Sequence, residues 1–309
     1  MKIIVITLSL FLSIKIYAQN PSQTSYWGLL PLLQNPVSFQ DQEEILVQAS
    51  FRSQWMSLEQ SAVNQRLFLS IPTVVRNLNF GLGFQNENIG VQSYTKFKGG
   101  LSRTFSTDAG IDFGLSGTVN YIQYSIRAND LNPVQQGDVL LSSQAQSNKL
   151  SYDLGLKAKY SDFSLGLAIN SINQPIFTEG ANNLLQELLW YNIILGYDKD
   201  ISNNLDLVSF ISLLSNTRVS QTSFEVGLTY RKKVFASVGM RGVGEKNTDA
   251  AILRGGFHSD IGKFYLTYEP GLSTLNEFHS NTLDLGVELK LANFLTKINK
   301  SAVYENPRY

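Results

Sequence analysis

Apolar and polar residues alternate one by one along most of this chain. In the stretch IDFGLSGTVNY, Ile111, Phe113, Leu115, Val119 and Tyr121 share one parity, and the other parity carries polar residues and glycine. Successive side chains of a β-strand point to opposite faces of the sheet, so this period of two predicts a strand with one apolar and one polar face. The pattern leaves open what covers the apolar face.

The same alternation recurs from residue 44 to residue 290 and predicts about fourteen strands. In chain order they span 44–53, 65–71, 79–85, 91–105, 110–124, 150–160, 163–170, 189–198, 205–214, 221–231, 233–241, 250–258, 261–269 and 281–290. The strand LDLVSFISLL (205–214) has apolar residues on both parities, so its register is ambiguous. No long amphipathic helix competes for the chain, which predicts an all-β protein.

The connections between the predicted strands differ in length in a regular way. Those after even-numbered strands are short, such as STDA (106–109) and SD (161–162), whereas several after odd-numbered strands are long, such as 125–149 and 171–188. Outer-membrane barrels have short periplasmic turns and longer extracellular loops. The sequence therefore predicts a transmembrane antiparallel up-and-down β-barrel, whose apolar face contacts lipid and whose closure leaves no unpaired edge.

Tyrosine placement agrees with a membrane protein. Many tyrosines fall toward predicted strand ends, where an amphipathic ring lies at the level of the lipid headgroups. They are Tyr121, Tyr124, Tyr152, Tyr160, Tyr191, Tyr197, Tyr230, Tyr265 and Tyr268. The general preference of tyrosine for sheets is the alternative explanation.

The polar faces of the strands are expected to line the barrel interior. They carry Arg52, Arg66, Lys96, Lys98, Asp112, Asp153, Lys157, Lys159, Glu225, Arg241, Arg254, Asp284, Glu288 and Lys290. Both signs of charge are present, so we expect ion pairs across the interior and no strongly selective pore. Arg103 shares the parity of Phe97 and Leu101, and we expect it to reach the membrane interface.

The first eighteen residues have the features of a secretory signal. Lys2 precedes the apolar run IIVITLSLFLSI, and Ala18 places a small residue before a cut at Gln19. The run is shorter than the roughly 20 residues of a membrane-spanning helix. We expect a signal peptide (1–18), an N-terminal periplasmic segment (19–43), an outer-membrane barrel (44–290) and a periplasmic C-terminal tail (291–309).

Composition argues against several kinds of chemistry. Charged residues make up 16% of the chain, below the roughly 25% of soluble domains, and the formal charge is zero. A neutral chain gives no support for nucleic-acid binding. Cysteine is absent, which excludes a thiolate metal site and a cysteine nucleophile. His258 and His279, with serines nearby, are a weak candidate for a barrel hydrolase. We therefore expect no catalytic residues, no cofactor and no metal.

An ordered set of short motifs resembles the PorP/SprF family of type IX secretion system membrane proteins. The set is Gln34-Asn35-Pro36, FRSQW (51–55), Ser70-Ile71-Pro72, Phe80-Gly81-Leu82-Gly83 and Asn88-Ile89-Gly90. The family residues matched are Asn35, Pro36, Arg52, Gln54, Trp55, Pro72, Gly81 and Gly83. This chain departs from the family pattern after Pro36, where Val37 stands, and after Trp55.

The resemblance implies an outer-membrane barrel that performs no chemistry. It implies a role in secretion or surface retention of a partner, such as a large gliding adhesin, with the C-terminal domain of that secreted substrate and other secretion components as ligands. A transport channel for small or hydrophobic solutes is the alternative function.

Physical arguments give the motif residues simple roles. Arg52 lies on the polar parity and is expected to pair with an interior carboxylate, whereas Trp55 is expected at the outer interface. Pro72 donates no ladder hydrogen bond, which suits a strand end. Gly81 and Gly83 either relieve curvature, which we favour, or make room for a neighbouring side chain or an inserted segment.

The predicted loop QPIFTEGANNLLQELLWY (174–191) is unusually apolar. It carries Ile176, Phe177, Leu184, Leu185 and Leu188. We expect LLQEL (184–188) to form one or two helical turns. The apolar residues either contact a secreted partner or pack into the barrel mouth.

Overall fold

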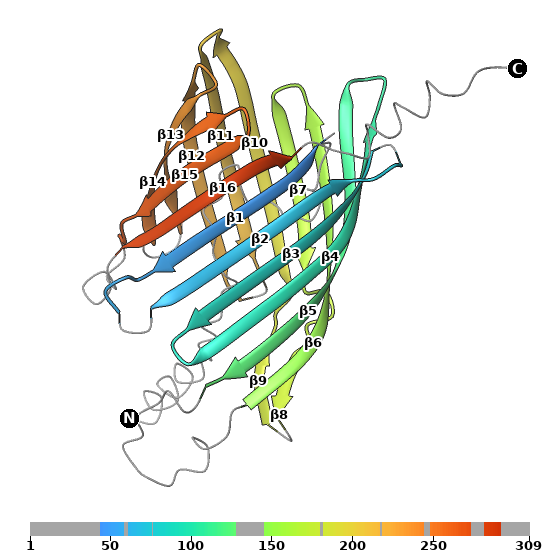
Figure 1. Cartoon of the computed structure of the whole chain (residues 1–309), viewed down its shortest axis with the longest axis vertical. Coiled ribbons are helices and arrows are strands. Elements are labelled where there is room, and N and C mark those ends of the chain that lie inside the picture. Colours follow the sequence, from blue (N-terminus) through green and yellow to red (C-terminus); the bar gives the residue numbers. More distant parts are fainter. Residues whose placement is uncertain are drawn as a thin grey trace, which may run out of the picture.

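A computed structural model describes residues 44–58, 61–75, 77–127, 145–179, 182–216, 218–243, 248–272 and 281–291. In these residues the chain forms one closed barrel of fourteen antiparallel strands (Figure 1). The barrel strands are β1 (Ile45–Gln54), β2 (Ala62–Pro72), β3 (Leu78–Ile89), β4 (Gln92–Ser106), β5 (Ile111–Ile126), β6 (Ala145–Tyr160), β7 (Phe163–Asn170), β10 (Trp190–Ser202), β11 (Leu205–Ser215), β12 (Ser220–Tyr230), β13 (Val234–Arg241), β14 (Ala250–Ser259), β15 (Gly262–Glu269) and β16 (Thr282–Leu291). The predicted fold class and strand number are confirmed.

Each barrel strand pairs with its neighbours along the chain, and β1 pairs with β16 to close the sheet. Closure is needed because a lipid-exposed strand edge would leave backbone N–H and C=O groups without partners. The β1–β16 register places Arg52 directly opposite Asp284. No helix in the described ranges is long and apolar enough to cross a membrane.

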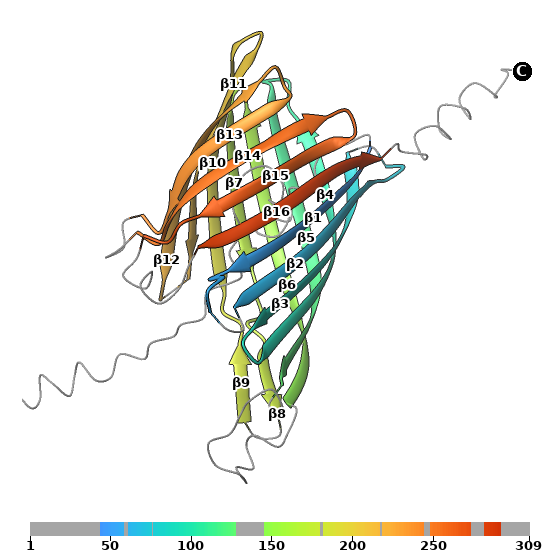
Figure 2. The same ribbon diagram turned by 60° about the vertical axis from the view of Figure 1, so that its left-hand side comes forward.

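A second, two-stranded sheet lies between β7 and β10 in the sequence. It consists of β8 (Ile176–Glu179) and β9 (Asn182–Gln186), and it extends beyond the ends of most barrel strands, beside the ends of β5 and β6 (Figure 2). The expected helical turns at 184–188 were wrong. Leu184 and Leu185 are in a strand because β8 supplies a pairing partner and because both side chains pack against an apolar cluster that contains Phe177.

The connections largely follow the predicted sorting by length. At one end of the barrel the connections are short, for example 107–110, 161–162, 203–204 and 260–261. The other end carries the β8–β9 hairpin and the connection 270–281. The connections 90–91 and 216–219 are short although they lie on the long side. Between β12 and β13, Arg231 and Lys232 have φ of 50° and 55°, as the two central residues of a type I′ hairpin turn require.

Alternation divides the strands into an apolar outside and a polar inside. Outward residues such as Leu154 and Val238 are 55% and 61% exposed, whereas the inward Asn120 and Ser151 are fully buried. Soluble proteins show the opposite distribution. Arg103 faces outward as expected and lies over the ring of Phe105.

Two of the tyrosines assigned to the membrane interface were placed wrongly. Tyr124 and Tyr265 are 3% and 6% exposed and point into the barrel. Tyr124 packs against Phe177, and Tyr265 packs against Phe235. Both have the parity of the polar face, and proximity to a strand end does not override that parity.

Several predictions concern residues outside the described ranges. They include the signal peptide (1–18), the segment 19–43 with Asn35 and Pro36, residues 128–144 of the predicted connection 125–149, and the tail that follows Leu291. These remain predictions.

Candidate functional site in the barrel interior and mouth

A row of polar side chains follows the inner surface of the barrel wall, strand by strand, where the first and last strands meet. Each of five neighbouring strands contributes one residue to the row, and each residue is paired in register with the next. In order around the barrel they are Arg52 on β1, Asp284 on β16, Thr267 on β15, Arg254 on β14 and Ser237 on β13. We call these five residues and their carboxylate partners Glu225 and Glu269 the seam cluster. Every one of them is at least 90% buried.

Glu269 is the centre of one half of the seam cluster. Both guanidinium NH groups of Arg52 donate to its carboxylate, at 2.8 and 2.7 Å, and Arg241 donates to Oε2 at 2.6 Å. Arg52 also lies 3.6 Å from the carboxylate of Asp284. Buried charges need this kind of pairing, because the cost of desolvating an unpaired ion is several kcal/mol.

Arg254 and Glu225 form the other half of the seam cluster. Nη1 of Arg254 lies 2.9 Å from Glu225, and its Nε donates to the hydroxyl of Thr267 at 2.7 Å. The hydroxyl of Ser237 donates to the same carboxylate of Glu225. The guanidinium also lies over the ring of Tyr265, 5.7 Å from its centroid. The arrangement connects β12 to β16 and β1 through charged groups.

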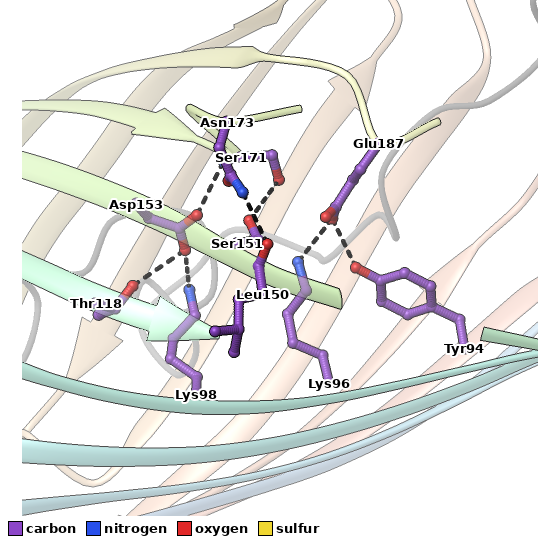
Figure 3. A network of polar contacts seen from close by, with 10 residues as sticks. All are labelled: Tyr94, Lys96, Lys98, Thr118, Leu150, Ser151, Asp153, Ser171, Asn173 and Glu187. Atoms are coloured by element: carbon purple, nitrogen blue, oxygen red, sulfur yellow. Dashed lines mark hydrogen bonds and ion pairs between the residues drawn. The ribbon is translucent and has the colours of Figure 1, made fainter. Parts of the chain in front are cut away.

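A second set of contacts lies on the opposite wall (Figure 3). Asp153 of β6 accepts from Lys98 at 2.8 Å and from Thr118 at 3.2 Å. It also accepts from the backbone N–H of Ser171, just after β7, at 3.0 Å. Asn173 donates to the backbone oxygen of Leu150 at 2.8 Å. These contacts fix the start of the segment that carries the β8–β9 hairpin.

The end of the same segment is fixed by Glu187. Its carboxylate accepts from the hydroxyl of Tyr94 at 2.6 Å and from the ammonium of Lys96 at 2.9 Å (Figure 3). Between the two ends, Phe177 of β8 is fully buried against Ile122 and Tyr124 of β5. We call Glu187, Phe177 and these partners the mouth cluster. It holds the hairpin against the inner wall of β4, β5 and β6.

The structure locates the predicted motif residues that it describes. Arg52 points inward and pairs with Glu269, as the parity of its strand predicts. Gln54 ends β1, and Trp55 follows it, half-buried, with φ of 60°. Pro72 is the last residue of β2.

The structure supports the second of the two explanations offered for Gly83. A Cβ atom built at Gly83 would overlap the ring of Phe68, which is 1% exposed inside the barrel. Gly83 therefore makes room for a neighbouring side chain. Gly81, on the same face, is buried.

The five apolar loop residues fall into two groups. Phe177 is fully buried, and Leu184 and Leu185 pack against it, so these three face the barrel. Leu188 is half-buried, whereas Ile176 is 40% exposed. Of the five, Ile176 is the residue most accessible to a partner.

Two important carboxylates were absent from the expected interior residues. Glu269 has the parity of Thr267 at the end of its strand, so the alternation contained the signal. Glu187 lies in the connection between β9 and β10, where no periodicity indicates which way a side chain points. Of the two histidines, His258 packs against Phe235 at a centroid distance of 5.1 Å, and His279 lies outside the described residues. No group of three potential His, Asp or Glu ligands is assembled in the described part of the chain.

Comparison with solved structures agrees with the barrel architecture. The CymD monoaromatic hydrocarbon channel matches with a TM-score of 0.53 and 13% identity, over 85% of this chain and 92% of that chain. A TodX monoaromatic hydrocarbon channel mutant matches with a TM-score of 0.50 and 12% identity, over 87% and 95%. At these identities the likeness shows the fold alone. No curated protein matches the sequence.

Comparison with family models gives a more specific result. The model of the type IX secretion system membrane protein PorP/SprF matches residues 16–289, which include the whole barrel apart from its last two residues. The match covers most of the chain and agrees with the motifs between Gln34 and Gly90. The chain belongs to the PorP/SprF family of type IX secretion system membrane proteins.

Proposed function

We propose that this protein is a non-enzymatic outer-membrane accessory of the type IX secretion system, required for secretion or surface retention of a partner protein such as a large adhesin. Family membership carries the proposal, because the matching model describes secretion system membrane proteins and covers nearly the entire barrel. The β8–β9 hairpin is the candidate contact for the partner's C-terminal domain. Other secretion components are the remaining candidate partners.

The anchoring of the hairpin supports this role. Asp153 fixes the start of the segment that carries the hairpin, and within the mouth cluster Glu187 fixes its end and Phe177 its middle. A preorganised surface loses little conformational entropy when a partner binds. Ile176 is exposed on this hairpin opposite Gln186, so it offers an apolar anchor within a polar surround.

The charged interior favours an accessory role over conduction. Cations and carboxylates on nearby strands are paired along the inside of the barrel wall, by side chains from β1, β4, β6 and β12 to β16. Such pairs keep their neighbours in place and give the interior no strong preference for one sign of charge. The alternative function, a channel for small or hydrophobic solutes, draws support only from a likeness of fold.

The test is complementation in the native bacterium. A strain that lacks this protein should lose a small set of proteins from its surface or medium, as measured by quantitative mass spectrometry, and the wild-type gene should restore them. Ile176→Asp should restore fewer of them. Ile172→Asp is the matched control, since Ile172 is 39% exposed and precedes the hairpin by four residues.

Two outcomes would contradict the proposal. One is an unchanged set of surface and secreted proteins in the deletion strain. The other is discrete conductance or solute uptake by the purified barrel in planar bilayers, which is the behaviour of the channel alternative. In each strain the amount of barrel in the outer membrane should be measured, so that loss of the protein is not mistaken for loss of function.

A further inference from the structure

A groove crosses the outer wall of the barrel between two rows of outward-facing side chains. One row runs from Leu101 through Gly117 to Leu154, and the other from Arg103 through Leu115 to Leu156. Both rows continue onto β7 and β10. The groove has a volume of about 760 Å³, and apart from Arg103 the side chains of these rows are predominantly apolar. We call it the wall groove.

Gly117 deepens the wall groove. It faces outward on β5 but has no side chain, and a Cβ atom built there would have Leu154 Cδ2 as its nearest neighbour at 3.6 Å. The floor between the two rows is made by residues that face into the barrel, among them Ser116 and Gly155. Strands lie about 4.8 Å apart, so a groove over five strands is about 19 Å long. Its dimensions suit an extended hydrocarbon chain.

Arg103 provides a positive charge at one end of the wall groove. It lies on the lipid-facing parity of β4, three residues before the strand ends and leads into the short turn 107–110. Short turns of such barrels lie on the periplasmic side, so Arg103 is near the periplasmic interface of the membrane. Its guanidinium lies over the ring of Phe105, with 5.2 Å between Cζ and the ring centroid.

The neighbourhood of Arg103 is apolar. Leu78 lies beside it on β3 and Leu115 on β5, and both line the groove. A guanidinium in such surroundings is stabilised by an anion that accepts two of its N–H groups at once, and two oxygens of a phosphate do this. The molecule that combines a phosphate with a hydrocarbon chain at this depth of a bilayer is a phospholipid.

We propose that the wall groove is a binding site for one glycerophospholipid of the periplasmic leaflet, with its phosphate on Arg103 and an acyl chain lying between the two rows. This inference depends on the barrel spanning a membrane and is independent of the role in secretion. Selectivity of the site comes from the contact between Arg103 and the headgroup phosphate. The rest of the groove is apolar and does not distinguish one acyl chain from another.

The first test measures the headgroup contact by native mass spectrometry. The full-length barrel is transferred to a mild detergent with added phosphatidylglycerol, and the ratio of singly lipid-bound to lipid-free protein is recorded. Arg103→Gln should lower this ratio by about tenfold, the usual effect of losing a hydrogen-bonded contact with an ion. Arg231→Gln is the matched control, because Arg231 also lies over an aromatic ring, that of Tyr230, but is outside the groove. It should leave the ratio unchanged.

The second test fills the groove and keeps the charge. Gly117→Leu places a side chain where the acyl chain is proposed to lie, and it should lower the ratio about as much as Arg103→Gln does. Gly99→Leu is the control, since Gly99 lies on the neighbouring strand β4, outside the groove lining, with no atom within 4 Å of a built Cβ. Circular dichroism and heat-dependent migration in gels verify that each variant is folded.

The outcomes separate the possible occupants. Binding that is equal for phosphatidylglycerol and for diacylglycerol with the same chains would overturn the proposal, because the phosphate contact would contribute nothing. An unchanged ratio for Arg103→Gln would overturn it as well. A dimer of barrels that Gly117→Leu dissociates, with no lipid retained, would assign the groove to a second copy of this chain and would also overturn it.

Discussion

Arg52 on β1 donates two hydrogen bonds to Glu269 on β15, two residues whose positions in the sequence differ by 217. The strand between them, β16, contributes Asp284 to the same cluster at 3.6 Å from Arg52. The contact therefore spans three strands across the place where the barrel closes. It gives Arg52, one of the predicted motif residues, a structural role in joining the first and last strands.

Glu269→Gln should destabilise the barrel strongly. The substitution leaves the guanidinium groups of Arg52 and Arg241 buried without their shared carboxylate, and removing one partner of a buried pair costs about 3–5 kcal/mol. Urea unfolding in lipid vesicles measures the change. Glu288→Gln is the control, because its ion-pair partner Lys263 is 36% exposed and the amide oxygen of the new glutamine can still accept from Gln48, so about 1 kcal/mol or less is expected there. Equal effects of the two substitutions would contradict a special role for the seam cluster.

Gly286→Ala should destabilise the barrel by about 1–3 kcal/mol, the usual cost of overpacking. A Cβ atom at this position would overlap the ring of Tyr265, which lies over Gly286 inside the barrel. The same substitution should cost much less when Tyr265 is replaced by serine, so a double-mutant cycle measures the coupling. Gly255→Ala serves as a control, since a Cβ there has its nearest neighbour at 3.9 Å. Additive effects of Gly286→Ala and Tyr265→Ser would contradict the packing argument.

Phe177→Ala should release the β8–β9 hairpin without unfolding the barrel. It creates a cavity against Ile122 and Tyr124, and such truncations cost about 3–5 kcal/mol. Hydrogen exchange should accelerate at the amides of β8 and β9 and remain slow in β4 and β5. Gln186→Ala changes an exposed residue of the same hairpin and should leave exchange unaltered. Faster exchange throughout the barrel would mean that Phe177 supports the whole fold.

Leu154→Lys tests whether the outside of the barrel contacts hydrocarbon. Leu154 faces outward within β6 and is 55% exposed, and a lysine near the bilayer midplane costs about 2–4 kcal/mol. Tyr160→Lys, at the end of the same strand, should cost about 0–1 kcal/mol. Folding free energies in vesicles provide the comparison, and similar values for the two variants would contradict the predicted depth.

The alternation of residues was sufficient to predict the barrel and the direction of most side chains. It works because one face contacts lipid and the other is polar, so a shift of one residue would exchange the two faces everywhere. The wrong predictions of side-chain direction concern tyrosines for which nearness to a strand end was given priority over the alternation. Tyr124 and Tyr265 were assigned by their nearness to strand ends, although their parity already placed them inside.

The mouth cluster was harder to predict. Phe177 and Glu187 belong to a connection, and their directions are determined by contacts with Tyr124, Tyr94 and Lys96 on strands far away in the sequence. Leu184 and Leu185 form a strand because β8 is beside them, and local propensity contains no information about that neighbour. The carboxylate of Glu269, in contrast, was predictable from its parity.

The join between β1 and β16 has a consequence for how the polypeptide matures. Arg52 is synthesised early, and the carboxylates that neutralise it arrive only with the final two strands. A sheet without the last two strands has two open edges and leaves the guanidinium of Arg52 without these carboxylates. We therefore expect a polypeptide that lacks the last two strands to remain open and to be degraded by proteases faster than the full-length protein.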